Sequence, residues 1–83
     1  MQMLYFGWVR QRIGVPAETV APPDEVRDVD GLIDWLSGRS DAYAEALRNR
    51  DTLRVAVNQE LCEFDAPVGA GDEVALFPPM TGG

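Results

Sequence analysis

The stretch VDGLIDWLSG, residues 29–38, has the period of a helix, whereas the segment before it reads as strands. Its apolar residues recur at i, i+3, i+4 and i+7, which gives an α-helix one apolar stripe: Val29, Leu32, Ile33 and Leu36. Asp28 precedes the stripe and can cap its first turn, and Gly38 can end the helix. We therefore predict one main helix here, packed by this stripe against the rest of the domain.

Segments on both sides of this helix have the apolar content and alternation of strands. We expect one further short helix at 41–48. We expect strands at 2–8, 18–21, 53–57, 61–64 and 73–77. A tight turn at 58–59 fits Asn58, because asparagine tolerates positive φ. Strands at both ends around one main helix predict an α+β domain, in which the helix crosses a mixed sheet and the first and last strands are central neighbours.

Composition limits the class of protein. A chain of 83 residues with 46% hydrophobic and 25% charged residues forms one small globular domain. The sequence has no apolar run of 18 residues and no basic region before its first apolar stretch, so we expect a cytoplasmic protein. Fourteen acidic residues against seven arginines give a net charge of −7, which disfavours nucleic acid and anionic membranes. This charge favours either a basic protein partner or simple solubility.

Side chains for internal catalysis are scarce. The sequence has no histidine and only one cysteine, Cys62, so we expect neither a metal site nor a hydrolase with a Ser–His or Cys–His pair. Cys62 follows Leu61 in a short apolar strand with no neighbouring cation, which favours a structural role. Any chemistry must therefore be completed by a partner.

The unusual reactive group is the α-carboxylate of Gly83, at the end of LFPPMTGG, residues 76–83. Pro78 and Pro79 fix two φ angles and hold the chain extended, whereas the two glycines can pass through a narrow channel. Met80 can adapt to an irregular channel wall. We expect a domain at 1–77 and an extended tail at 78–83, comprising Pro78, Pro79, Met80, Thr81, Gly82 and Gly83.

Three apolar residues are placed near the tail end of the sheet: Phe6, Leu61 and Phe77. They form either part of the core or an exposed docking patch. Arg10, Arg12 and Arg54 can add polar contacts there.

The stretch VAVNQELCEFDAPVGAGDEVALFPPMTGG, residues 55–83, resembles the small subunit of molybdopterin synthase, the MoaD family of ubiquitin-like sulfur carriers. The most specific strings are GDEVA at 71–75 and Phe77-Pro78-Pro79 followed by Gly82-Gly83. MLYFGWVRQRIG at 3–14 is similar to the family's first strand and turn, and residues 29–47 are similar to its helical middle.

This resemblance implies a β-grasp fold and a specific chemistry. An E1-like enzyme adenylates Gly83 with ATP, and the adenylate is converted to a thiocarboxylate. The large synthase subunit, in a heterotetramer of two small and two large subunits, accepts the tail and transfers two such sulfurs to cyclic pyranopterin monophosphate. By analogy Phe6, Leu61 and Phe77 pack on the large subunit, which supplies the catalytic pocket, and the small subunit itself binds no cofactor.

Two other functions share the Gly-Gly end. A ubiquitin-like modifier would join Gly83 to amines on other proteins; the absence of lysine means that this chain could not build chains on itself. A sulfur carrier of another pathway, for thiamine or tRNA thiolation, is the second alternative. The Phe-Pro-Pro step and the fuller helical middle argue against the thiamine pathway.

Overall fold

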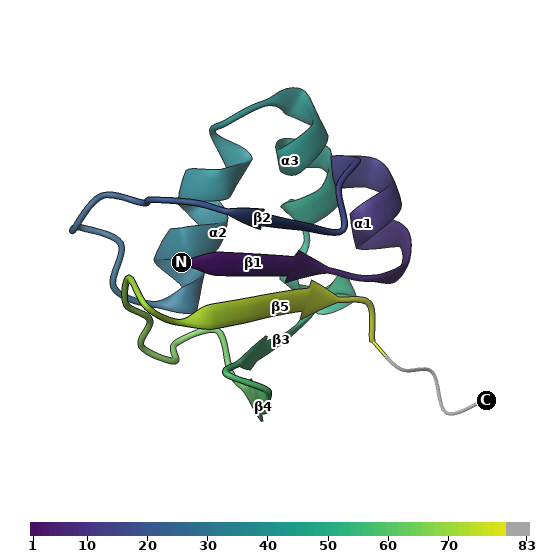
Figure 1. The fold of residues 1–83 in the computed structure, drawn as a ribbon. Helices are drawn as coiled ribbons and strands as arrows, with labels where there is room; N and C mark the ends of the chain where they lie inside the picture. Colours follow the sequence, from purple (N-terminus) through teal and green to yellow (C-terminus); the bar gives the residue numbers. More distant parts are fainter. Residues whose placement is uncertain (80–83) are drawn as a thin grey trace.

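The computed structural model describes residues 1–79, which form a five-stranded mixed sheet and three α-helices. In chain order the elements are β1 (Gln2–Tyr5), α1 (Gly7–Ile13), β2 (Ala17–Thr19), α2 (Val29–Ser37), α3 (Asp41–Leu47), the 3-10 turn η1 (Arg50–Thr52), β3 (Arg54–Val57), β4 (Glu60–Cys62) and β5 (Glu73–Phe77). The strand order is β2-β1-β5-β3-β4, with β1 and β5 parallel and the other pairs antiparallel (Figure 1). This confirms the predicted α+β, ubiquitin-like β-grasp fold with the first and last strands adjacent at its centre.

One face of the sheet packs against the helices, which lie behind the strands in Figure 1. Alternate residues of the central strands point into this core, so that Met3 lies beside Val74 and Tyr5 beside Leu76. All four residues of the predicted α2 stripe are fully buried: Val29, Leu32, Ile33 and Leu36. The apolar period of residues 29–36 therefore fixed how α2 packs on the sheet.

The caps of α2 also match the prediction. The Asp28 carboxylate accepts a hydrogen bond from the backbone N–H of Gly31 at 2.8 Å, and the backbone of Gly38 closes the helix. The turn at 58–59 is confirmed as well, because Asn58 and Gln59 both have positive φ, at 52° and 71°.

The prediction of a strand at 2–8 was wrong beyond Tyr5. Residues 7–13 form α1, which the sequence analysis missed, and Trp8 lies on this helix rather than on a strand. Gly7 has a φ of 59°, a left-handed conformation that turns the chain out of the sheet and that glycine adopts at little cost. Val9 is buried and Ile13, four residues later, packs against the core. The helical spacing of Val9 and Ile13 is the signal that could have revealed α1.

Other boundaries move by a few residues. β2 ends at Thr19 and β4 at Cys62, short of the predicted 21 and 64. The chain leaves β4 because the carbonyl of Phe64 accepts a hydrogen bond from Asp30 at the start of α2 instead of pairing in the sheet. Leu53 follows η1 as a fully buried residue, and β3 begins one residue later. Within residues 1–79, no helix has the length and hydropathy needed to cross a membrane.

Candidate functional site

The site begins where β5 ends. The backbone N–H of Phe6 donates to the carbonyl of Leu76 at 3.2 Å, which extends the parallel pairing of β1 and β5 past Tyr5. Pro78 and Pro79 follow β5 and have no N–H group with which to continue the sheet. The backbone of Gly7 lies against the Pro78 ring, so closely that a Cβ at Gly7 would be 2.7 Å from Pro78 Cγ. Because Pro78 follows the central strand β5 and packs against Gly7, it has a fixed position at one end of the sheet.

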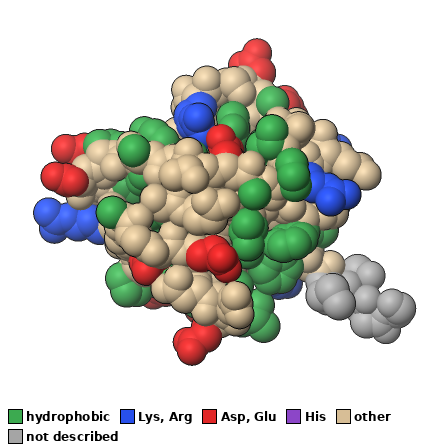
Figure 2. All heavy atoms as spheres, viewed as in Figure 1, with side chains coloured by type: hydrophobic (Ala, Val, Ile, Leu, Met, Phe, Trp, Pro, Cys, Tyr) green, Lys and Arg blue, Asp and Glu red, His purple; other side chains and the backbone are tan. Residues whose placement is uncertain are grey.

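Apolar groups surround this exit point. A hollow of ≈ 460 Å³ lies where the chain leaves β5, and no charged side chain lines it. We call the lining of this hollow the tail-root surface; it comprises Phe6, Gly7, Ala75, Phe77, Pro78 and Pro79. A hollow of similar volume, about 490 Å³, lies elsewhere on the domain and has charged residues in its lining. Phe6 is 48% exposed and Phe77 is half-buried. In Figure 2 hydrophobic side chains gather beside the start of the grey segment.

The apolar surface continues across the sheet face that points away from the core. Leu4, Ala75, Ala56 and Leu61 lie in one row, because they are direct partners across β1, β5, β3 and β4. Leu61 is 76% exposed, an unusual position for a leucine. Phe77 lies on the same face, directly opposite Arg54. Phe6 and Leu61 are therefore exposed residues rather than core residues; binding of a partner by Phe6, Leu61 and Phe77 stays a prediction.

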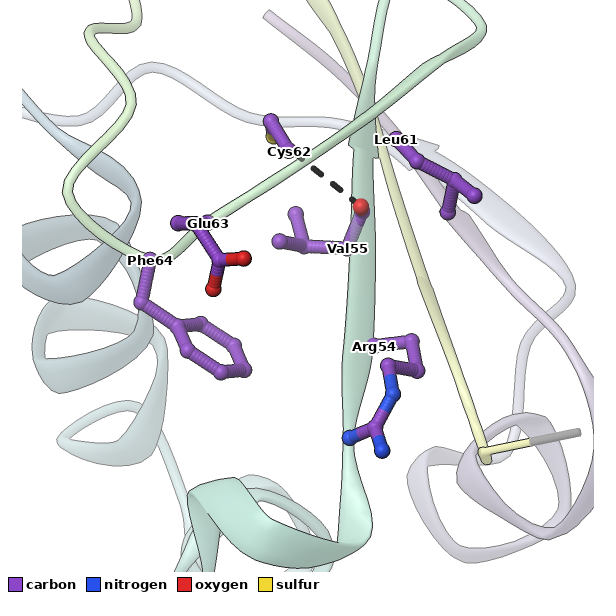
Figure 3. Close-up of a pocket in the computed structure, with 6 residues that line it drawn as sticks. All are labelled: Arg54, Val55, Leu61, Cys62, Glu63 and Phe64. Carbon is purple, nitrogen blue, oxygen red and sulfur yellow. Dashed lines mark hydrogen bonds between the residues drawn. The ribbon is translucent and has the colours of Figure 1, made fainter.

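Cys62 faces a second hollow, which Figure 3 shows with its lining residues Arg54, Val55, Leu61, Cys62, Glu63 and Phe64. Its Sγ atom lies 3.9 Å from the carbonyl oxygen of Val55. Burial is the largest influence on this thiol and raises its pKa, and the carboxylates of Glu63 and Asp65 act in the same direction. A raised pKa keeps the sulfur protonated and unreactive, in keeping with the structural role expected for it.

The principal polar cluster of side chains lies on the core side of β2. The hydroxyls of Tyr5 and Tyr43 both donate to Glu18 Oε2, at 2.8 and 2.7 Å, and Arg39 donates to Glu18 Oε1 at 3.2 Å. Burial tends to raise the pKa of Glu18, but the hydrogen bonds from Tyr43 and Tyr5 and the charge of Arg39 outweigh it and lower this pKa. The cluster joins β1, β2 and α3, so its role is structural.

Residues 1–79 contain no group of three or more His, Cys, Asp and Glu side chains placed to hold a metal ion. The predicted tail residues Met80, Thr81, Gly82 and Gly83 lie outside the described residues. Gly7 and Ala75 belong to the tail-root surface but were not predicted. The signal that could have revealed them is a glycine at the end of the first strand, Gly7, together with Pro78 just after the last strand, its parallel neighbour.

The fold places this protein in the class of ubiquitin-like proteins. Its last strand, β5, lies at the centre of a β-grasp sheet and ends beside an exposed apolar surface. The family model described as ThiS family matches residues 3–83. Over 83 residues, which are 100% of this chain and 99% of the relative, the chain is 42% identical to the molybdopterin synthase sulfur carrier subunit of Escherichia coli (strain K12). The chain belongs to the ThiS family and, within it, to the MoaD group of molybdopterin synthase sulfur carrier subunits.

Solved structures share this fold. SAMP1 from Haloferax volcanii superimposes with a TM-score of 0.75 at 30% identity, covering 100% of this chain and 98% of that one. A structure described as the protein-protein complex of subunits 1 and 2 of molybdopterin-converting factor from Helicobacter pylori 26695 contains a chain with a TM-score of 0.65. That chain is 22% identical, with 99% of this chain and 96% of that chain covered, and it supports the fold.

Proposed function

We propose that this protein is the sulfur carrier of a molybdopterin synthase and that it acts in molybdenum cofactor biosynthesis. The observation that carries the proposal is its 42% identity, over its whole length, to a relative that bears the name sulfur carrier subunit. The similarity includes the tail, since the ThiS family model extends to residue 83.

The reacting group in this proposal is the Gly83 carboxylate, which is a poor electrophile until it is activated. Attack of a carboxylate oxygen on the α-phosphorus of ATP releases pyrophosphate and forms an acyl-adenylate. A sulfide donor then attacks the carbonyl carbon and displaces AMP, which leaves a thiocarboxylate. An E1-like enzyme supplies ATP and the adenylation site, and we place these steps in the cytoplasm because they consume ATP. The carrier binds no cofactor of its own.

Sulfur transfer requires the thiocarboxylate to reach a pocket in another protein. Cyclic pyranopterin monophosphate would receive two sulfurs there, each delivered by one carrier tail: the sulfur bonds to a carbon of the pterin as a thioester, and water then cleaves the bond between the sulfur and the acyl carbon, which restores the Gly83 carboxylate. Burial raises the pKa of Cys62, which disfavours a reactive thiolate there, so this proposal assigns the catalytic pocket to the partner.

The geometry of the tail root suits delivery into such a pocket. β5 lies between β1 and β3, so its end cannot swing without breaking sheet pairing on both sides. Pro78 packs on Gly7, and two consecutive prolines restrict the backbone beyond that contact. A tail that starts from a fixed point loses less conformational entropy when it enters a channel. This supports the assignment of Pro78 and Pro79 to the base of a delivery arm.

The partner in this proposal is the large subunit of the synthase, in an assembly of two small and two large subunits. Phe6, Leu61 and Phe77 would dock on it, because exposed apolar residues of this size mark interaction surfaces. The Escherichia coli relative is named as a subunit, and the Helicobacter pylori structure of the same fold is described as a complex of two subunits.

A second function, as a protein modifier, is favoured by one observation. Haloferax volcanii SAMP1, one of the similar structures, is 30% identical, and another Haloferax volcanii structure of the same fold is described as a small archaeal modifier protein. A modifier would form isopeptide bonds between Gly83 and lysines of other proteins.

Reconstitution tests the proposal. The thiocarboxylated chain is mixed with a large subunit and cyclic pyranopterin monophosphate, and molybdopterin is measured by its fluorescent oxidation product. We expect product that depends on both proteins and ceases when the thiocarboxylate is consumed. Lack of product with a large subunit that is active with its own small subunit would refute the proposal, and isopeptide adducts in the producing cell would support the modifier.

A further inference from the structure

Charge is distributed unevenly over this acidic chain. Residues 6–17, which contain α1 and the approach to β2, carry two arginines and no acidic residue. Arg54 begins β3, which is antiparallel to β5, and therefore lies at the end of the sheet from which Pro78 emerges. This end of the molecule is basic although the net charge of the chain is −7.

Three exposed arginines at this end make no ion pair within residues 1–79, and we call them the arginine rim: Arg10, Arg12 and Arg54. By contrast, Arg39 pairs with Glu18 at 3.2 Å, and Arg50 pairs with Asp30 and Asp34 at 3.1 and 3.0 Å. Arg39 and Arg50 therefore have structural partners, whereas the guanidinium groups of the rim keep their charge available.

The arginine rim borders the tail-root surface. Arg54 lies directly opposite Phe77 in the sheet, and Arg10 is three residues beyond Gly7, which contacts Pro78. Arg12 stacks over the Trp8 ring at 5.5 Å, which restricts its side chain on the outside of α1. Glu63 lines the same hollow as Arg54 but forms no ion pair with it.

The opposite end of the sheet is acidic. β1 and β5 both begin there, as does β4, and the carboxylates at this end include Asp24, Glu25, Glu60, Asp72 and Glu73. The arginine rim therefore lies at the end of the sheet from which the chain leaves β5, and this acidic group lies at the other end.

We propose that the arginine rim binds carboxylates at the mouth of the channel by which the large subunit receives the tail. This inference rests on the proposed function and names a feature of its partner. Net charge alone favoured a basic partner. The arginine rim instead predicts that the partner's contact surface is acidic. Guanidinium groups pair with carboxylates through two parallel hydrogen bonds, so the rim would fix the orientation of docking as well as attract the partner.

The position of the rim also bears on how the two proteins meet. A negative field at the channel mouth attracts the rim and repels the acidic end, so that encounters with the tail forward are favoured. Complementary charges of this kind act mainly on the association rate and lose their effect as salt screens them.

Charge reversal tests this inference with a matched control. The rim variants are Arg10→Glu, Arg12→Glu, Arg54→Glu and the triple variant, and the control is Arg27→Glu. Arg27 is also exposed and without an ion pair within the described residues, but it lies in the connection after β2, beside the acidic end. Each single reversal changes the net charge equally, so only position differs. Association with the purified large subunit is followed by stopped flow at increasing NaCl concentration.

At low salt we expect each rim reversal to slow association about threefold and the triple variant to slow it by tenfold or more, roughly the range of electrostatic steering. Arg27→Glu should change the rate by less than about 1.5-fold, because its charge is far from the contact. Rim variants that bind as fast as Arg27→Glu, or faster than the unchanged chain, would overturn the inference about the arginine rim and leave the proposed function standing. Failure of the unchanged chain to bind the large subunit would instead refute the proposed function.

Discussion

Replacement of Leu61 by alanine separates docking from folding. Leu61 is 76% exposed in the free domain, so little of its side chain contributes to the core. Full burial of a leucine side chain is worth about 1.5–3 kcal/mol. About three quarters of that gain, roughly 1–2 kcal/mol, remains available when a partner covers the exposed part of Leu61. The expected loss of affinity for the large subunit is therefore roughly 5- to 30-fold in Kd.

The effect on stability should be small by comparison. An exposed substitution of this kind changes the free energy of unfolding by less than about 0.5 kcal/mol. Leu76→Ala is the control, because Leu76 is fully buried in the central strand β5 and its truncation should cost about 2–5 kcal/mol. Isothermal titration calorimetry gives Kd, and urea denaturation gives the free energy of unfolding.

Two results would refute this reasoning. If Leu61→Ala destabilises the domain as much as Leu76→Ala, Leu61 belongs to the core after all. If Leu61→Ala leaves both stability and Kd unchanged, the row of Leu4, Ala75, Ala56 and Leu61 is not the docking face.

Three further substitutions test other parts of the structure. Asp28→Ala removes the cap of α2 and should cost about 1 kcal/mol of unfolding free energy, whereas Ser40→Ala, at the start of α3 where no side-chain cap bond forms, should cost much less in the same urea titration. Because the pKa of Glu18 is lowered on folding, its ionised form stabilises the domain above its ordinary pKa of 4.5, and this stability is lost as the pH falls below that value. Glu18→Gln should therefore lower the thermal midpoint at pH 7 and lose this difference under acidic conditions; a constant difference would contradict the linkage. Deletion of Gly83 should abolish formation of the thiocarboxylate and leave the thermal midpoint unchanged; a lower midpoint would mean that the tail is structural.

The sequence predicted the elements whose side-chain period is regular. The α2 stripe, its Asp28 cap and the turn at Asn58 were all found, because each depends on local chemistry. α1 was missed because residues 2–8 are apolar on both faces and hide the turn at Gly7, and the need for a residue without a Cβ at this turn arises from the contact with Pro78. That contact joins residues far apart in sequence.

The candidate site was predicted only in part, because its exposure also depends on contacts between residues far apart in sequence. Leu61 and Phe77 were placed near the tail, but whether they were core or surface depended on the helices, which cover only one side of the sheet. Arg10, Arg12 and Arg54 were expected beside these residues, but the sequence did not predict that they would be free of ion pairs within the described residues. Only the strand order shows that the start of β3 and the end of β1 flank the same exit.

The central claim is that Gly83 carries sulfur, and mass spectrometry of the intact chain tests it most directly. The chain is incubated with an E1-like activating enzyme, a sulfide donor and ATP, with omission of ATP as the control. We predict a gain equal to the difference between one sulfur and one oxygen atom, located on the C-terminal peptide and dependent on ATP. An unchanged mass with an enzyme that activates a related carrier, or ATP-dependent isopeptide adducts in place of the sulfur gain, would contradict the account.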